Sequence, residues 1–514
     1  MAKNRRRTPS RKKQTKQSRS MFLSLFLSDN ILARLLTRCV VGQVIVPIDT
    51  LPDEVLLVIF HFFVDKGAND KNASKKEVDA WQSLVHVCRR WRSVVFGSPR
   101  RLNLRLLCET KTLVSTLDIW PPLPLVIQGG VSTNSHAVAV LERSNRVCQI
   151  NLFGYNTSPM ENVLAAMQQP FPELTDLEIK VFNKPVEAIP DSFLGGSSPR
   201  LRCLKLDGIP FPGLPKLLLS ATHLVDFQLR NIPHSGYMSP EAMVTALSTL
   251  TSLEILILKS MSSRSSPNWA SQPSPPTRSL LPVLGTLRFE GVQEYFDDLV
   301  ARIDAPRLNG LSAAFINQDV LDTPQFIQLI RRTSAFEVLE TAHVSFEVDG
   351  AWVELSSKTL GYEGLKVRIP CGALEEQLEF LEEVFSSCLP PLSTGTPKDL
   401  YISESICPQP DWPEDDIDNT LWLEVLRPFI AVKNLYLSEV IASSIAPALQ
   451  ELVGDRTTEV LPALEKIFLE GPRPRGHAQK GIREFISARK LSGHPITVSP
   501  LPERERDWEW ELGY

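Results

Sequence analysis

A short apolar phrase with the pattern L-x-x-L-x-L recurs along most of the chain, for example as LTDLEI from Leu174 and LVDFQL from Leu224. Alternating apolar and polar positions of this kind are typical of a strand that buries one face. Successive copies start 23 to 35 residues apart, a spacing that predicts a solenoid in which each repeat packs on its neighbours. The copies begin at residues 147, 174, 201, 224, 253, 284, 308, 336, 362, 397, 432 and 464.

Helices are predicted between the phrases. Three segments open with a residue that caps helices, followed by a proline, which suits the first helical position. These pairs are Ser158-Pro159, Ser239-Pro240 and Thr323-Pro324, and a longer helical pattern covers Leu374–Cys388. Strand, turn, helix and return together predict an α/β solenoid with parallel strands. A Ser/Pro-rich stretch, residues 262–279, is expected to form a flexible insertion.

Residues 47–97 show a different pattern, in which apolar side chains surround a helix on nearly all sides. A helix is expected to open at Leu51-Pro52, and every residue from 55 to 63 except His61 is apolar. After a polar loop, residues 78–96 predict a second helix. A unit of about 50 residues cannot cover two faces of so apolar a helix by itself. The surplus apolar surface therefore requires a partner, either the rest of the chain or another protein.

The two helical segments resemble the F-box motif. LPDEVLLVIFHFF carries the Leu-Pro helix start, and VHVCRRWRSVV carries the Val-Cys-Arg-x-Trp signature, over roughly a tenth of the chain. The repeats behind them resemble irregular leucine-rich repeats in which the usual asparagine is mostly missing. The chain is thus similar to fungal F-box proteins with degenerate leucine-rich repeats.

This resemblance implies that the helical unit docks to a Skp-type adaptor protein and, through it, to a cullin-type (SCF-like) ubiquitin ligase. The alternative is that the same residues form the core of a helical hairpin, and we prefer that interpretation for Val55, Leu84 and Val85. For Leu51 and Pro52 we prefer the interpretation that they lie in the interface with the adaptor. Carried onto this sequence, the adaptor-binding residues are Leu51, Pro52, Leu56, Ile59, Val87, Cys88 and Trp91.

In such a solenoid the strands line a concave face, and the variable positions of each phrase point into it. In the last three phrases the position between the second and third apolar residues is Tyr401, Tyr436 and Phe468. In-register strands would place these rings side by side as an exposed aromatic ladder, and exposed aromatic patches often mark interaction sites. We expect the ladder to contribute to binding a protein substrate. The alternative is that the C-terminal tail, with Trp508 and Trp510, covers it.

Charge is spread unevenly along the chain. Residues 1–20 hold nine Lys or Arg and no acid, which leaves 46 basic against 59 acidic residues elsewhere, a net charge of -13. Such an acidic body does not suit a nucleic-acid backbone. The basic tail indicates either a nuclear-localisation signal or a solvated tail. The apolar residues after it are interrupted by Asp29, Arg34 and Arg38, so no membrane span is expected, and a cytoplasmic or nuclear protein is predicted.

No pattern for catalysis or metal binding is found. The sequence lacks phosphate-binding, dinucleotide-binding, zinc-protease and nucleophile-elbow motifs, and its eight cysteines show no C-x-x-C spacing. We therefore predict a protein that is not an enzyme and binds no cofactor or metal. Two alternatives stay open: a repeat scaffold unrelated to ubiquitination, and an enzyme on an irregular α/β fold.

These patterns divide the chain into four parts: a disordered basic and apolar extension (1–45), a small all-α F-box-like unit (46–105), an irregular leucine-rich-repeat-like α/β solenoid (106–498) and a C-terminal tail (499–514).

Overall fold

The computed structural model describes residues 48–68, 80–99, 101–112, 114–182, 186–259, 278–316, 323–357, 364–388, 397–404, 418–470 and 477–501. The predicted extension, nearly all of the Ser/Pro-rich insertion, and Trp508 and Trp510 of the tail lie outside these residues. The chain divides into two compact units, Met1–Leu106 and Leu107–Tyr514. None of the described helices has the length and apolar character that crossing a bilayer requires.

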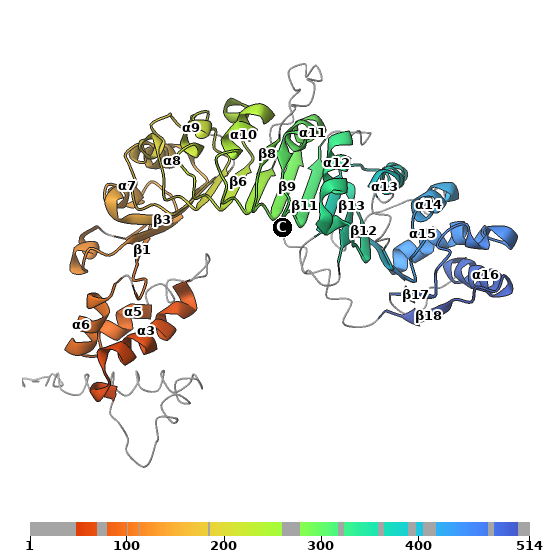
Figure 1. Cartoon of the computed structure of the whole chain (residues 1–514), viewed down its shortest axis with the longest axis horizontal. Coiled ribbons are helices and arrows are strands. Elements are labelled where there is room, and N and C mark those ends of the chain that lie inside the picture. The colour runs from red at the N-terminus through yellow and green to blue at the C-terminus, as the bar shows by residue number, and fades with distance from the viewer. Residues whose placement is uncertain are drawn as a thin grey trace, which may run out of the picture. The chain divides into compact units, whose positions relative to one another are not determined.

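The first unit is a cluster of short helices: η1 (Ile48–Thr50), α3 (Asp53–Ala68), α5 (Ala80–Val85) and α6 (Arg89–Gly97) (Figure 1). The single second helix predicted for residues 78–96 is wrong, because α5 and α6 are separate. Cys88 has an extended backbone (φ −154°, ψ 172°), and its Sγ accepts a hydrogen bond from the Trp91 backbone N–H at 3.4 Å. This cap starts α6 in a new direction.

Aromatic side chains form the core of the first unit. The ring centroids of Phe60 and Trp91 lie 4.7 Å apart, and those of Trp81 and Phe96 lie 5.9 Å apart. The Trp81 Nε1–H donates to the Arg105 carbonyl at 2.8 Å, so the buried indole keeps a partner. Leu84 and Val85 are buried, which confirms them as core residues.

The second unit contains one long sheet of sixteen described strands, in the order β1-β2-β3-β4-β5-β6-β7-β9-β11-β14-β13-β12-β15-β16-β17-β18. Helices lie along the outer side of this curved sheet (Figure 1). A separate pair joins β8 to β10. The strands are β1 (Leu106–Glu109), β2 (Leu125–Gly130), β3 (Val147–Gly154), β4 (Asp176–Val181), β5 (Cys203–Asp207), β6 (Asp226–Arg230), β7 (Ile255–Lys259), β8 (Ser279–Leu280), β9 (Thr286–Gly291), β10 (Ile303–Asp304), β11 (Gly310–Phe315), β12 (Thr341–Glu347), β13 (Gly350–Ser356), β14 (Gly364–Ile369), β15 (Asp399–Glu404), β16 (Asn434–Leu437), β17 (Lys466–Leu469) and β18 (Thr497–Pro500).

The connections carry the helices predicted from helix-start signals, but Ser158 lies inside α8 (Thr157–Ala166) rather than capping it, and Thr323 makes no side-chain cap hydrogen bond to α12 (Pro324–Arg332). Ser239 caps α10 through a hydrogen bond from the Ala242 N–H, and the predicted helix Leu374–Cys388 is observed with those bounds. The helices and 3-10 turns are η2 (Val114–Ile119), α7 (Ala137–Leu141), η3 (Ser144–Arg146), α8 (Thr157–Ala166), η4 (Phe193–Gly196), α9 (Leu214–Leu218), η5 (His234–Gly236), α10 (Pro240–Leu247), α11 (Gln293–Ala301), α12 (Pro324–Arg332), η6 (Ser334–Phe336), α13 (Leu374–Cys388), α14 (Asn419–Leu426), α15 (Glu439–Gln450), η8 (Gly454–Thr458) and α16 (His477–Leu491).

The repeated phrase sets the register of the sheet. Its apolar positions are buried, as Leu174, Leu177 and Ile179 show with no exposed surface. Equivalent positions pair directly: Leu177 lies opposite Leu204, which lies opposite Phe227. The predicted α/β solenoid dominated by parallel strands is therefore observed, and its last strand, β18, continues to Pro500 rather than ending at residue 498.

The prediction of uniformly parallel strands is wrong at one place. β12 and β13 form an antiparallel hairpin across the two residues Val348 and Asp349, and β13 is also antiparallel to β14. β14 then pairs with β11, and β12 pairs with β15, so spatial order and chain order run in opposite directions here. The loop residues are Val348 and Asp349, so the Asp-Gly pair at 349–350, which favours a two-residue hairpin when it forms the loop, does not occupy the loop here.

The phrase assigned to residues 336–341 is also shifted. Phe336 and Leu339 are buried, but the strand starts only at Thr341, and Ala342 occupies the place opposite Leu400. The strand is thus set three residues later than predicted.

A buried arginine holds the C-terminal repeat together. The Arg489 side chain in α16 is fully buried and donates to the carbonyls of Thr457 at 3.0 Å, Leu461 at 3.2 Å and Leu464 at 3.3 Å. These carbonyls belong to η8 and to the segment that leads into β17, so one guanidinium joins α16 to the part of the chain that precedes β17. A buried carbonyl that loses its donor is costly.

We expect Arg489→Met to lower the free energy of unfolding of this repeat by about 3 kcal/mol, because several carbonyls lose their donors at once. Amide hydrogen exchange in residues 457–464 should then become faster. The control is Lys490→Met, which changes the exposed neighbouring side chain. Equal exchange rates in the two variants would contradict this role for Arg489.

Candidate functional site

The first unit carries an apolar stripe on the outside of α3. Val55, Val58 and Phe62 are 42%, 46% and 66% exposed. Their spacing of three and four residues places them on one face of the helix. Together we call them the α3 stripe. The expectation that Val55 belongs to the core is wrong.

Two residues predicted to contact the adaptor lie inside the unit instead. Leu56 has no exposed surface, and Trp91 is 6% exposed with its ring against Phe60. Their side chains therefore position α3 and α6 rather than forming the outer surface. Among the other predicted contact residues, Leu51, Ile59 and Cys88 are half-buried, while Pro52 and Val87 are exposed.

The Leu-Pro segment is fixed to α6 by Arg90. The guanidinium donates to Asp53 Oδ1 at 2.7 Å and to the Leu51 carbonyl. The ion pair between Arg90 and Asp53 is largely exposed, so it contributes little to stability. It does hold the start of α3 beside the start of α6, which sequence reasoning did not foresee.

On the second unit, the predicted aromatic ladder is present and longer than expected. Tyr401 pairs with Tyr436, and Tyr436 pairs with Phe468. Their ring centroids lie 4.0 and 4.5 Å apart at interplanar angles of 9° and 7°. His343 of β12 adds a fourth ring, 4.3 Å from Tyr401 and inclined by 5°. These distances follow from parallel strands that lie about 4.8 Å apart.

Stacking covers much of the ladder. Each inner ring has its two faces against its neighbours, so Tyr436 is only 8% exposed, and Tyr401 and Phe468 are half-buried. The ladder therefore offers ring edges rather than ring faces to a partner. Beyond Phe468 the next position is Ser499 of β18.

Sequence reasoning missed His343 because it placed the strand three residues too early. The alternation of Ala342, Val344 and Phe346, which are all buried, is the signal that identifies the strand correctly. His343 then falls on the opposite, concave side of the sheet.

Burial lowers the pKa of His343 to about 4, with Asp399 opposing the shift and Lys366 adding to it. At neutral pH the ring is therefore uncharged, which avoids the cost of burying a charge within the row. Burial likewise lowers the pKa of Lys366, against the influence of Glu354 and Glu347. The Lys366 Nζ lies 4.1 Å from the centroid of the Trp352 ring, in a cation–π arrangement.

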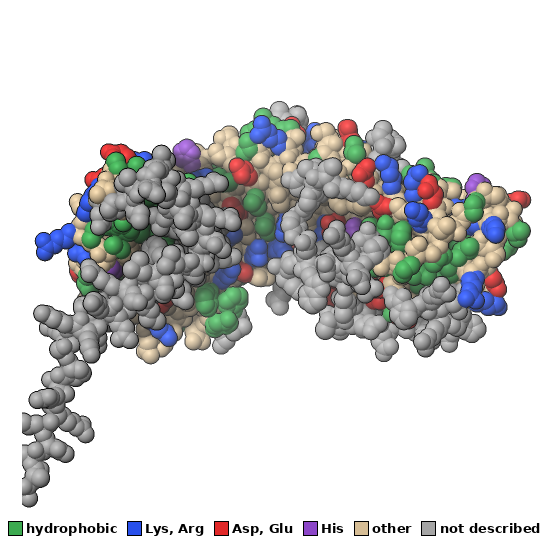
Figure 2. Space-filling model, turned by 90° about the horizontal axis from the view of Figure 1, so that it is seen from below, with side chains coloured by type: hydrophobic (Ala, Val, Ile, Leu, Met, Phe, Trp, Pro, Cys, Tyr) green, Lys and Arg blue, Asp and Glu red, His purple; other side chains and the backbone are tan. Residues whose placement is uncertain are grey.

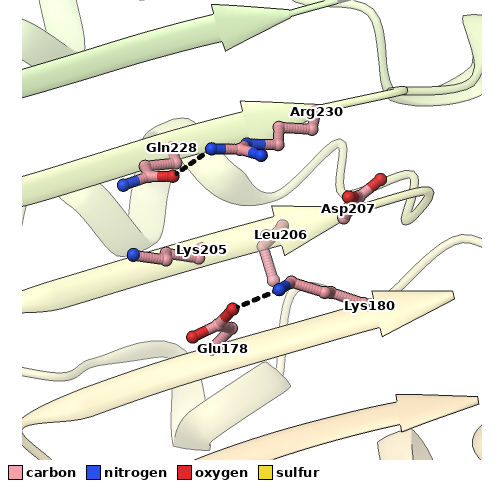
Figure 3. Close-up of a pocket in the computed structure, with 7 residues that line it drawn as sticks. All are labelled: Glu178, Lys180, Lys205, Leu206, Asp207, Gln228 and Arg230. Carbon is pink, nitrogen blue, oxygen red and sulfur yellow. Dashed lines mark hydrogen bonds and ion pairs between the residues drawn. The ribbon is translucent and has the colours of Figure 1, made fainter. Parts of the chain in front are cut away.

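Toward the N-terminal end the concave face is charged. Side chains of β4, β5 and β6 line a shallow depression of about 90 Å³ (Figure 3). Its size is that of one side chain, far below the several hundred Å³ of small-molecule sites. In Figure 2, basic and acidic side chains lie together in the middle of the view, and hydrophobic side chains gather toward the C-terminal end. The lining residues are Glu178, Lys180, Lys205, Leu206, Asp207, Gln228 and Arg230.

Several polar side chains that line the depression pair with one another, and one of these pairs is an ion pair. Lys180 Nζ lies 2.7 Å from Glu178 Oε1, and Arg230 Nη2 donates to Gln228 Oε1 at 3.0 Å, as Figure 3 shows. Over the described ranges, no group of three or more His, Cys, Asp or Glu side chains converges as a metal site would require.

No family model matches the chain, and no curated protein matches it. Among solved structures it is similar to the leucine-rich repeat-containing protein LegL7 from Legionella pneumophila, at 13% identity and a TM-score of 0.26. The match covers 74% of this chain and 97% of that one. At this TM-score the two chains do not superpose as a whole, so the solenoid assignment rests on the strand order and register described above.

The neutral state of His343 makes stability depend on pH. The pKa is near 6.5 when the chain is unfolded and about 4 when it is folded, so the unfolded state binds more protons between these values. Stability is then fully present above pH 6.5 and falls as the pH drops toward 4, by up to about 3 kcal/mol. We expect His343→Phe, which keeps the stacked ring, to lose less thermal stability than the unmodified protein between pH 7 and pH 4.5.

The control for this comparison is His223→Phe at an exposed position. Melting temperatures that fall in parallel for His343→Phe and the unmodified protein would show that His343 does not cause the pH dependence.

Proposed function

We propose that this chain is the substrate-recognition subunit of a cullin-type (SCF-like) ubiquitin ligase. In this proposal the first unit docks to a Skp-type adaptor as an F-box, and the concave face of the solenoid binds a protein substrate. The observation that carries it is the α3 stripe, an apolar surface on a helix that the resemblance assigns to docking.

The energetics support docking at this position. Fully burying a Val or Phe side chain contributes roughly 1.5 to 3 kcal/mol, and the three residues of the α3 stripe lie together on one helix face. Leu51, Pro52 and Val87 add apolar surface in the same unit, and Arg90 fixes the geometry of the Leu-Pro segment. Leu56, Ile59, Cys88 and Trp91 would then act largely by shaping the unit.

The substrate surface in this proposal includes the ladder. The half-buried edges of Tyr401 and Phe468 offer apolar contact, while Tyr436 mainly keeps the row rigid. A rigid row needs no ordering when a partner binds, which favours affinity.

A second candidate is a non-catalytic leucine-rich-repeat scaffold with no link to ubiquitination. The observation that favours it is the solenoid itself, whose concave face can bind a partner without the first unit. The two candidates differ only in whether the α3 stripe binds an adaptor.

We expect the double substitution Val58→Glu with Phe62→Glu to weaken binding of the full chain to a purified Skp-type adaptor by about 100-fold or more. Two carboxylates would then have to be buried against an apolar partner. Binding is measured by isothermal titration calorimetry and by co-elution in size-exclusion chromatography. Substituting Leu51 and Pro52 by Ala should weaken it as well.

The matched control is Ile430→Glu with Val453→Glu, which places two charges at apolar positions of the second unit with comparable exposure. It should bind the adaptor like the unmodified protein. If the unmodified chain shows no affinity for the adaptor, the scaffold is the better description. If the α3 variant binds as tightly as the control, the stripe is not the docking surface.

A further inference from the structure

We infer that the ends of strands β3 to β7 form a two-point recognition site for an extended peptide segment. One point binds an aromatic side chain of the partner, and the other binds an anionic side chain about four residues away. This inference rests on the proposed substrate-binding role of the concave face, and it names the class of substrate.

The first point is a group of three aromatic rings, the β3–β4 aromatic cluster, in which Phe153 and Tyr155 are exposed and Phe182 is half-buried. Tyr155 stacks on Phe182 at 5.1 Å and meets Phe153 edge-on at 6.4 Å. Phe153 is 37% exposed and Tyr155 is 60% exposed. In contrast to the stacked ladder, this cluster leaves substantial ring surface uncovered, which is the property of an aromatic anchor point.

The cluster lies on the concave face, in register with a row of charged residues. Phe153 pairs with Lys180, which pairs with Asp207. Asp207 pairs with Arg230, which pairs with Lys259. Side chains at paired positions of parallel strands point to the same side of the sheet. A partner that crosses the strands would therefore meet these side chains in this order.

The second point is the cation pair Arg230 and Lys259. Like charges directly opposite each other on neighbouring strands are unfavourable, and an anion between them would relieve this repulsion. Within the described part of the chain, Arg230 makes its side-chain hydrogen bond to the neutral Gln228. Lys259 lies 3.8 Å from Glu290, with both groups about one-third exposed.

Asp207, the acidic residue opposite Arg230 on β5, has a hydrogen-bond partner of its own. Asp207 Oδ1 accepts a hydrogen bond from Asn231 Nδ2 at 2.8 Å. Lys180 is held by Glu178 at 2.7 Å. Arg230, whose described side-chain hydrogen bond goes to a neutral group, is thus the cation best placed for an incoming anion, with Lys259 and its longer contact to Glu290 beside it. The shallow depression that Arg230 lines has the volume of a single side chain.

The spacing of the two points fixes the spacing in the partner. From β3 to β6 there are three strand intervals, which is about 14 Å. An extended peptide covers about 3.3 Å per residue, so about four residues separate its two anchors. Because side chains of an extended peptide alternate, residues an even number apart face the same side. A spacing of four therefore satisfies both points, and a spacing of five turns one side chain away.

The test uses the full chain and fluorescein-labelled synthetic peptides on a Gly/Ser background. One peptide carries Trp and Glu four positions apart, and its relatives carry Gln or phosphoserine in place of Glu, or a spacing of five. We expect the Glu or the phosphoserine peptide to bind about tenfold more tightly than the Gln peptide in fluorescence anisotropy, and the two arms distinguish a carboxylate from a phosphate. The five-residue spacing should weaken binding.

Two variants locate the site. Arg230→Ala should remove the preference for the anionic peptide, and Tyr155→Ala should weaken every Trp-containing peptide by about tenfold. Arg307→Ala, at an exposed position outside the site, is the control. Equal affinity for the Glu, phosphoserine and Gln peptides, or no effect of both variants, would overturn the inference. Adaptor binding is measured separately through the α3 stripe, so either proposal can fail without the other.

Discussion

In-register parallel pairing is the constraint on which the second unit depends. Backbone hydrogen bonds fix neighbouring strands about 4.8 Å apart, and each repeat then places equivalent side chains in rows. On the helix-covered side of the sheet these rows are apolar and join one core, as Leu177, Leu204 and Phe227 show. On the concave side the same geometry stacks Tyr401, Tyr436 and Phe468 at van der Waals distance. The spacing of the scaffold thus determines the contacts of the surface.

The first unit, in contrast, does not bury all of its apolar side chains. Its helix α3 carries more apolar surface than its own small core can cover, so Leu56 and Phe60 are buried while Val58 and Phe62 face outward. A unit of this size cannot bury both faces. In the proposed function, the first unit docks through apolar side chains that it leaves exposed. The second unit binds through side chains that its regular sheet places in rows.

The repeat, most of the helices and the row of three aromatic residues could be predicted from the sequence, because each depends on a local pattern of residues. The sequence did not reveal the hairpin of β12 and β13, since alternating apolar residues look the same in parallel and antiparallel strands. Nor could it tell which side of α3 is exposed, because a helix that is apolar nearly all round has no polar stripe to mark its outer face. The break before α6 depends on the Cys88 cap, and the β3–β4 aromatic cluster on tertiary register; neither has a strong local pattern.

The reversed strand order between β11 and β15 affects how the chain is made. During synthesis the strands before β11 can join the sheet one after another as they leave the ribosome. The edge of β11, which ends at Phe315, must then wait for β14, which ends at Ile369, because β12 and β13 are translated between them yet lie beyond it. At about 5 to 20 residues per second this leaves an open strand edge for several seconds. The middle of the solenoid is thus open to wrong pairing while the chain is made, although both edges of β11 are paired in the finished sheet.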